Sequence, residues 1–367
     1  MKNKSTITAR RHSVLFIIML LHASLSMGQQ ILKDLTQQTT FGGYVVGQAS
    51  VNNEEGNSKH SDMGIRMVRF YADGRVMDLA YKLQVHMSGM PGSTSGPRIL
   101  DAWAEWQHWK ALRLKFGQMK RGFSFENPMH PWNIGFGTYS QLSTKLAGLN
   151  DRVGEHSSNG RDFGIQLQGD LFPTHRDNHR WFHYQVGLFN GQGINASEVN
   201  SHKDIIGGFW VMPVENLQIG AFGWTGNFCK DGITVDRNRY AFGLNYSGKK
   251  VMVRSEFAVS EGHKISDYKG ADGQILTTPT GTDGADGWYL AAGTSVAPRT
   301  KIYCKWDVYR DEKDWNSAHQ MYCISAEHLF HPNIKLQANY AFHHQKDTAP
   351  YDLRRYHTAD LQLYWRF

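Results

Sequence analysis

The segment 120–159 concentrates side chains that could act on a solute. It opens with an adjacent cation pair, Lys120 and Arg121, where the alternating stretch LRLKFGQM gives way to glycine, proline and aromatic residues. A lysine attracts an anion as a point charge, and an arginine adds a paired hydrogen bond to a phosphate or carboxylate. The large aromatic residues that accompany the pair are Phe123, Phe125, Trp132, Phe136 and Tyr139. This composition suits electrostatic contact with an anion.

The sequence offers little for catalytic or metal chemistry. Of its 18 histidines, His343 and His344 are adjacent on an expected strand and therefore face opposite sides. No cysteine or carboxylate cluster accompanies His175, His179 and His183 at metal-ligand spacing. No G-x-S-x-G nucleophile turn occurs either. We therefore expect no catalytic residue, no metal site and no cofactor.

Two further features leave alternatives open. The loop 261–285 contains DYKGADGQ and GTDGADGW, whose oxygens could bind Ca²⁺, but the spaced ligand pattern is absent and a solvated surface loop is favoured. The three cysteines, Cys229, Cys304 and Cys323, form no disulfide framework. In the expected register Cys304 and Cys323 face opposite sides of neighbouring strands, so free thiols are favoured over a disulfide.

The elements that must position these residues are β-strands. Sixteen segments between residues 39 and 367 alternate apolar and polar side chains, and none of comparable length has the period of an amphipathic helix. Long connections alternate with tight links such as ADGR (72–75), APR (297–299) and HPN (331–333). Short turns at one end and long loops at the other are typical of a membrane barrel, whereas a soluble sandwich does not require them. We therefore predict an all-β fold, a transmembrane antiparallel up-and-down β-barrel of about 16 strands.

The alternation also assigns the two faces of the wall. In the last strand Leu361, Leu363, Trp365 and Phe367 share one face, which suits lipid. A cation against hydrocarbon costs roughly 2–4 kcal/mol near the bilayer midplane, so the polar face points into an aqueous lumen. The cations expected on the lumen wall include Lys82, Arg113, Lys250, Arg254, Lys305, Lys335 and Arg366. In total ten inward cations accompany eight inward acids, and this near balance predicts only a mild anion preference.

The connection 120–159 is the third of the long ones and is longer than a surface loop requires. Because its aromatic side chains gain free energy by leaving water, we expect this long third outer loop to fold into the lumen and narrow it. The alternative is a surface loop that packs on neighbouring loops or on a second subunit.

Three motifs resemble a known family: GQMKRGFSFE (117–126), GRDFGIQ (160–166) and GLFNG (187–191). They are similar to the porin O and P family, the phosphate-selective porins of Gram-negative outer membranes. The resemblance implies a sixteen-stranded barrel, usually trimeric, whose third outer loop bends into the lumen. It also implies an anion path lined by cations, a role that falls here on Lys115, Lys120, Arg121, Lys145 and Arg152.

The N-terminus predicts export. Residues 1–28 combine an acid-free cationic run, a short apolar block and a small-residue exit, which is the pattern of a signal peptide. The apolar block is too short for the roughly 20 residues of a membrane-spanning helix. Without this peptide the barrel domain, 29–367, has a formal net charge of +3 rather than +7. No basic cluster is evident, so we expect no nucleic-acid partner.

Together these observations predict an outer-membrane porin rather than an enzyme. It would allow passive diffusion of small hydrophilic solutes with a mild anion preference, for which phosphate is a candidate. The predicted partners are the lipid bilayer of the outer membrane, small anions or hydrophilic solutes, and further copies of the chain in a homotrimer. The alternatives are an outer-membrane barrel enzyme and a surface adhesin or scaffold barrel with a closed lumen.

Overall fold

The computed structural model describes residues 38–367 apart from 57–59, 88–95, 175–178, 270–273 and 347–352. The predicted signal peptide, 1–28, and part of the candidate calcium loop lie outside the described residues. Within the described part, no helix has the length and apolar character needed to cross a membrane.

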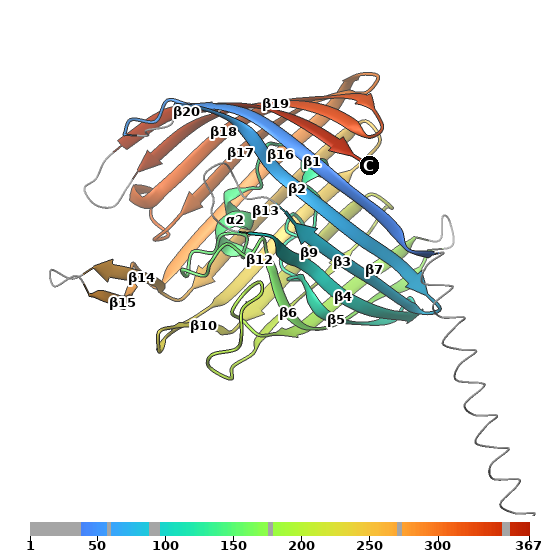
Figure 1. The fold of residues 1–367 in the computed structure, drawn as a ribbon, viewed down its shortest axis with the longest axis horizontal. Helices are drawn as coiled ribbons and strands as arrows, with labels where there is room; N and C mark the ends of the chain where they lie inside the picture. Colours follow the sequence, from blue (N-terminus) through green and yellow to red (C-terminus); the bar gives the residue numbers. More distant parts are fainter. Residues whose placement is uncertain (1–37, 57–59, 88–95, 175–178, 270–273, 347–352) are drawn as a thin grey trace, which may run out of the picture.

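Sixteen antiparallel strands close into one barrel (Figure 1). They are β1 (Thr40–Asn52), β2 (Ser61–Val76), β3 (Leu79–His86), β4 (Arg98–Trp109), β5 (Leu112–Lys120), β6 (Arg161–Pro173), β7 (Arg180–Phe189), β8 (Asp204–Val211), β9 (Leu217–Thr225), β12 (Asn238–Ser247), β13 (Val251–Glu261), β16 (Gly284–Ala297), β17 (Thr300–Arg310), β18 (Ala318–His331), β19 (Ile334–Lys346) and β20 (Leu353–Arg366). These strands follow one another around the wall in chain order, and β20 closes the barrel by pairing with β1. The predicted barrel of about 16 strands is confirmed.

Short elements occupy the long connections. β10 (Asn227–Lys230) pairs with β11 (Ile233–Asp236), and β14 (Lys264–Lys269) pairs with β15 (Ile275–Thr280). The helical turns are η1 (Pro131–Asn133), α2 (Gln141–Leu146) and η2 (Trp315–Ser317). The hairpin β14–β15 projects beyond the wall at the left of Figure 1. In this hairpin the carboxylate of Asp267 forms an ion pair with Lys230 at 2.6 Å.

One tight link differs from the sequence prediction. β2 continues through the predicted turn 72–75 and pairs Gly74 with Tyr81 of β3. The turn itself falls two residues later, where Met77 adopts a φ of 54°. Gly74 is needed for close packing rather than for turning, because a Cβ at this position would lie 2.5 Å from the Tyr81 hydroxyl oxygen.

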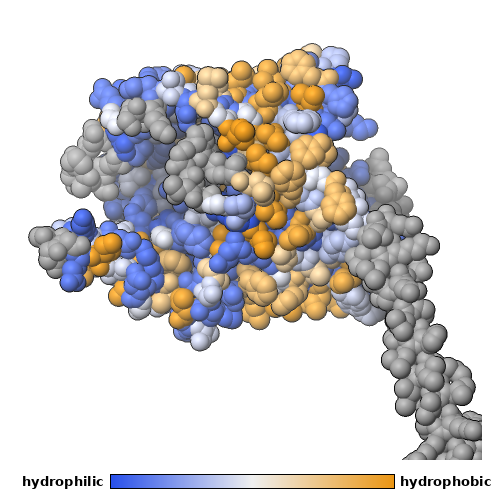
Figure 2. Space-filling model, in the orientation of Figure 1, coloured by the Kyte–Doolittle hydropathy of each residue, from blue (hydrophilic) through white to orange (hydrophobic). Residues whose placement is uncertain are grey.

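The two faces of the wall have the predicted chemistry. Leu361 and Leu363 are 46% and 50% exposed on the outer face of β20, whereas Gln362 and Tyr364 on its inner face are each 1% exposed. Figure 2 shows apolar side chains gathered over the barrel wall and hydrophilic ones at the end that carries β14 and β15. The outer face therefore presents the apolar surface that hydrocarbon requires.

The cysteines are free thiols, as predicted. Across the β17–β18 pair, Cys304 lies opposite Ile324 and Cys323 lies opposite Lys305. Because the two cysteines differ by one position in register, their side chains point to opposite faces of the sheet.

Candidate permeation site

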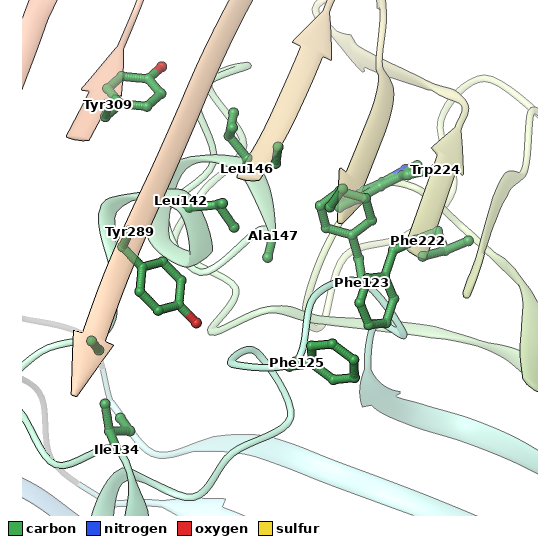
Figure 3. Close-up of a cluster of buried hydrophobic side chains, with 14 of the residues drawn as sticks. Phe123, Phe125, Ile134, Leu142, Leu146, Ala147, Phe222, Trp224, Tyr289 and Tyr309 are labelled. Carbon is green, nitrogen blue, oxygen red and sulfur yellow. The ribbon is translucent and has the colours of Figure 1, made fainter. Parts of the chain in front are cut away.

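The segment between β5 and β6, residues 121–160, lies inside the barrel, and we call it the L3 segment. Phe125 packs edge-on against Phe222 of β9 with ring centroids 5.0 Å apart, and Phe123 packs against Trp224 at 5.8 Å (Figure 3). On its other side α2 packs against β13, β16 and β17. Removal of these rings from water favours the inward position of the segment.

Local sequence signals shape the L3 segment. Ser140 caps α2, because its hydroxyl accepts a hydrogen bond from the backbone N–H of Ser143 at 3.1 Å. Gly160, with a φ of 69°, returns the chain to β6. A Cβ at Gly160 would overlap the Asn127 side chain, so the close approach of these two parts of the segment also requires glycine.

A buried ionic cluster anchors one side of the L3 segment. Three guanidinium groups surround the Trp224 indole, with Cζ-to-centroid distances of 4.8 Å for Arg121, 4.7 Å for Arg237 and 4.7 Å for Arg239. The ion pairs are Arg121 with Glu155 (3.0 Å) and Asp162 (2.9 Å), Arg237 with Glu155 (2.6 Å) and Asp204 (2.6 Å), and Arg239 with Asp151 (2.6 Å). These pairs join the segment to β6, β8 and β12, and they compensate charges that would otherwise be costly to bury.

The wall formed by β13, β17 and β19 holds the opposite side. The Glu256 carboxylate accepts hydrogen bonds from the backbone N–H groups of Phe125 (2.7 Å) and Glu126 (3.1 Å). Three further bonds are donated by the Gln141 backbone to Asp307 (3.0 Å), by Lys335 to the Trp132 carbonyl (2.7 Å) and by Arg254 to the Ile134 carbonyl (2.9 Å). The L3 segment is thus fixed to the wall from both sides.

Two carboxylates of the L3 segment are kept ionised by these anchors. Burial by itself raises the pKa of Glu126, but the charge of Arg254 and hydrogen bonds from Ser140 outweigh burial and hold this pKa below its ordinary value. Burial likewise raises the pKa of Asp151, and the Arg239 guanidinium outweighs it, so this pKa is also lowered. Docking of the segment therefore depends on ionised carboxylates.

The structure corrects two residues predicted for the anion path. Arg121 is 0% exposed and is already bound by carboxylates. The Arg152 side chain is 1% exposed, donates to the Gly262 carbonyl at 2.6 Å and lies 3.7 Å from an Asp311 carboxylate oxygen. Both arginine side chains are therefore engaged in holding the L3 segment in place.

Five of the predicted lumen-wall cations have three different environments. Arg254, Lys305 and Lys335 lie on the inner face as predicted, but they are 2%, 3% and 0% exposed beneath the L3 segment. Arg366 stacks with its guanidinium 3.8 Å from the Trp132 ring centroid. Lys250 departs from the prediction, because it lies exposed in the turn between β12 and β13 rather than on the lumen wall.

A cavity of about 490 Å³ remains beside the L3 segment and is bounded by strands from β2 to β9. Its lining includes five predicted cations, Lys82, Arg113, Lys115, Lys120 and Arg121, and two that the sequence did not identify, Arg69 and Arg161. Among the described residues, Asp101 is the one carboxylate in this lining, and Arg161 pairs with it at 2.8 Å. The cavity therefore carries an excess of positive charge.

Three lysines of this lining form no ion pair with a carboxylate among the described residues. Lys115 Nζ lies 3.7 Å from the Trp103 ring centroid and Lys82 Nζ lies 5.0 Å from that of Tyr71, and neither lysine has an ion pair within the described part of the chain. Lys120 Nζ donates to two backbone carbonyls of the L3 segment, at 2.5 and 3.0 Å.

Lys145 lies elsewhere. It is in the last turn of α2 and lines a second cavity, of about 630 Å³, together with Lys264 and Lys346. The structure thus brings Lys115 and Lys120 together in one cavity and separates Lys145 from them.

The two lining cations that were not predicted, Arg69 and Arg161, differ in whether the sequence contains a signal for them. Arg69 lies on β2. The pairing of β2 with β1 shifts register at Val46/Gly47, so a simple two-residue alternation does not continue through this pair of strands. Arg161 stands inside the motif GRDFGIQ at the return of the L3 segment to the wall. The motif signalled Arg161, whereas no sequence signal identified Arg69.

Histidines serve packing and hydrogen bonding. His183 Nδ1 lies 2.6 Å from an Asp170 carboxylate oxygen, and its ring stacks on Trp210 with centroids 3.8 Å apart. In the described ranges no group of three or more His, Cys, Asp or Glu side chains is arranged to hold a metal ion.

Comparisons with known proteins agree with this architecture. The porin of Comamonas acidovorans described as anion-selective has a TM-score of 0.65 and 15% identity, over 90% of this chain and 99% of that one. OmpF of Salmonella typhi, solved with daunomycin, has a TM-score of 0.64 and 12% identity, over 90% and 97%. OmpT of Vibrio cholerae, an outer membrane protein in its trimer form, has a TM-score of 0.57 and 12% identity, over 89% and 99%.

At the sequence level, no curated protein matches the chain. The model of the family "Phosphate-selective porin O and P" matches residues 42–187, the part that contains most of β1, all of β2 to β6, the L3 segment and most of β7. The resemblance to the porin O and P family is thereby confirmed over residues 42–187, in a chain whose barrel has the porin fold.

Proposed function

We propose that this protein is an outer-membrane porin through which small hydrophilic solutes diffuse passively, with a preference for anions. The observation that carries the proposal is the cavity beside the L3 segment, in which Lys82, Lys115 and Lys120 face one carboxylate, Asp101, that is already paired. Cations along a narrow aqueous path lower the barrier for an anion that loses part of its hydration. Phosphate is one candidate solute, because lysine and arginine bind it well.

The proposal is of a channel and not of an enzyme. The polar groups of the L3 segment are mostly engaged in holding it to the wall, as the buried pairs of Arg121 and Arg239 illustrate. Most groups that line the cavity are cations, amides and aromatic rings, which can bind and orient a solute. Of the two histidines in this lining, His183 is hydrogen-bonded to Asp170 and stacked on Trp210.

The test is the reversal potential of the purified protein in a planar bilayer under a KCl gradient. We expect ohmic channels that favour chloride, and we expect the double variant Lys82→Gln/Lys115→Gln to lower the chloride-to-potassium permeability ratio by about twofold or more. Lys269→Gln is the matched control, because Lys269 is exposed on the projecting hairpin β14–β15. Absence of conductance, or a preference for potassium, would overturn the proposal.

We also propose a homotrimer. An outward groove of about 550 Å³ between β1, β2, β19 and β20 is lined by small residues, Ala49, Ala338 and Ala359, which allow close approach of a second barrel. The mass of the detergent-solubilised protein, measured by light scattering, tests this proposal. Replacement of Ala338 by Trp should reduce the trimer fraction, and a wild-type mass equal to one chain would exclude a trimer.

A further inference from the structure

The cavity beside the L3 segment has a second lining that a simple inorganic anion does not require. Five glutamines line it, from β3, β6, β7 and β9: Gln84, Gln166, Gln168, Gln185 and Gln218. Two of them stand directly beside cations on the neighbouring strand, since Gln166 is paired in register with Lys115 and Gln168 with Arg113. Side chains at such paired positions are about 5 Å apart at Cβ, so one solute can reach both.

The hydrogen-bonding capacity of these amides is only partly used. Gln166 donates to the Gln168 side-chain oxygen at 2.8 Å, whereas the Gln166 Oε1 atom is buried and has no hydrogen-bond partner. Gln166 as a whole is 5% exposed and lines the cavity. Gln185 donates to the Gly122 carbonyl of the L3 segment at 3.1 Å. A free amide oxygen needs a donor. A sugar offers several hydroxyl donors at spaced positions, whereas inorganic phosphate near neutral pH keeps only one or two P–OH groups on the atom that carries its charge.

Flat apolar surfaces complete the lining. The Trp103 ring lies beneath Lys115 Nζ, and the Trp210 ring carries the stacked His183 ring. Both indoles line the same cavity as the glutamines. Indole rings offer a large apolar surface to the carbon–hydrogen groups of a ring-shaped solute. The volume of about 490 Å³ also suits a small organic molecule better than a single inorganic ion.

We propose that this cavity prefers a small carbohydrate bearing one anionic group, either phosphate or carboxylate, over inorganic phosphate. The anionic group lies against Lys82 and Lys115, and the solute hydroxyls exchange hydrogen bonds with Gln166 and Gln185. This inference rests on the proposed function, because it names the class of anion that the same path accepts.

The experiment measures block of the chloride current through single channels of the full-length protein. The probes are glucose 6-phosphate, glucuronate, inorganic phosphate and glucose. We expect at least one of the two sugar anions to halve the current at a concentration about tenfold lower than inorganic phosphate does, because a hydroxyl contact with the unpaired Gln166 amide oxygen adds to the charge contact. Comparison of the two sugar anions shows whether phosphate or carboxylate is favoured.

Two variants test whether the tighter block by sugar anions depends on the glutamine amides. Gln166→Leu and Gln185→Leu should each bring the concentration at which the sugar anions block the current toward that of inorganic phosphate. Gln185 is half-buried, so Gln185→Leu carries the test if Gln166→Leu does not fold. Gln48→Leu is the matched control, because Gln48 lies on β1 and lines a different cavity.

Failure of this inference is distinguishable from failure of the proposed function. Equal block by the sugar anions and inorganic phosphate, in a channel that still prefers chloride, overturns the inference alone. Block by glucose as strong as the block by both sugar anions also overturns it, because the cations would then contribute nothing. Loss of the chloride preference in the wild-type channel overturns the proposed function as well.

Discussion

The inner wall of the barrel has two regions that use the same residue types in different ways. On β12 to β19 the cations Arg239, Arg254, Lys305 and Lys335 are 0–3% exposed and lie beneath the L3 segment. On β3 and β5, Lys82 and Lys115 remain open to the cavity. We call the first region the docked wall and the second the open wall. The difference arises because the L3 segment lies across one side of the lumen and not the other.

This comparison shows why a total of inward charges is a poor guide to selectivity. The expected ten cations and eight acids nearly cancel, yet the cavity lining has seven lysine and arginine side chains and one carboxylate. On the docked wall acids such as Asp307 and Glu256 are used by backbone donors of the L3 segment. Segregation of the charges, rather than their sum, produces the positive cavity.

The largest expected effect comes from the ionic cluster that anchors the L3 segment. Arg239→Met should lower the free energy of unfolding by about 3–5 kcal/mol, because it leaves Asp151 buried without its guanidinium partner. Denaturant titration in detergent micelles measures this change. Arg113→Met on the open wall is the matched control, since the Arg113 side chain is 22% exposed. A loss below about 1 kcal/mol for Arg239→Met would contradict the role of the cluster.

A smaller expected loss of stability, without a change in ion selectivity, distinguishes the docked wall from the open wall. Lys335→Met should lower the free energy of unfolding by about 1–3 kcal/mol, because it removes the donor to the Trp132 carbonyl and one partner of Glu327. It should leave the reversal potential in KCl unchanged, in contrast to Lys82→Gln/Lys115→Gln. A shift of the reversal potential as large as that of the open-wall variant would show that the docked wall also contacts permeant ions.

Acid should weaken docking of the L3 segment. The pKa values of Glu126 and Asp151 are lowered in the folded protein, so their contribution to docking is complete above the ordinary pKa of a carboxyl group, about 4, and is lost as the pH falls toward the folded values. Hydrogen exchange of residues 141–155 should therefore accelerate below about pH 4 relative to the strand amides. Constant protection of 141–155 down to the pH at which the barrel unfolds would refute this dependence.

The smallest expected effect distinguishes the lumen from the lipid face. In a Cys229→Ser background, a charged thiol reagent should modify Cys323, which lines an inner cavity of about 340 Å³, faster than Cys304 on the outer face. Single-cysteine variants in lipid vesicles, followed by mass spectrometry, measure the two rates. Equal rates would contradict the assignment of faces on β17 and β18.

Much of the fold could be predicted because strand alternation is a local property. The outward Leu361 and inward Gln362 follow from a two-residue period that needs no knowledge of distant residues. The turn after β2 was misplaced for the opposite reason. Gly74 resembles a turn residue in sequence, but it is there to accommodate the Tyr81 hydroxyl on the next strand, which only the pairing of β2 with β3 reveals.

The candidate site could be predicted only in part. The position of the L3 segment and its cation-rich character were evident from its length and composition, and Lys115 and Lys120 do line the cavity. The exposure of each cation was not evident. Arg121 follows Lys120 directly, yet its side chain enters the cluster around Trp224, more than 100 residues away in the chain.

The barrel, its two faces and the long connection that enters it can be inferred from the residue order, because each depends on residue spacing within one strand or one loop. Which inward cations are buried and which are free depends on contacts between distant parts of the chain. Lys335 and Lys115 have the same alternation, but Lys335 donates to the carbonyl of a residue 203 positions away, whereas Lys115 borders the open cavity. Burial of a charge is settled by partners that meet across the lumen, and no local pattern encodes that meeting.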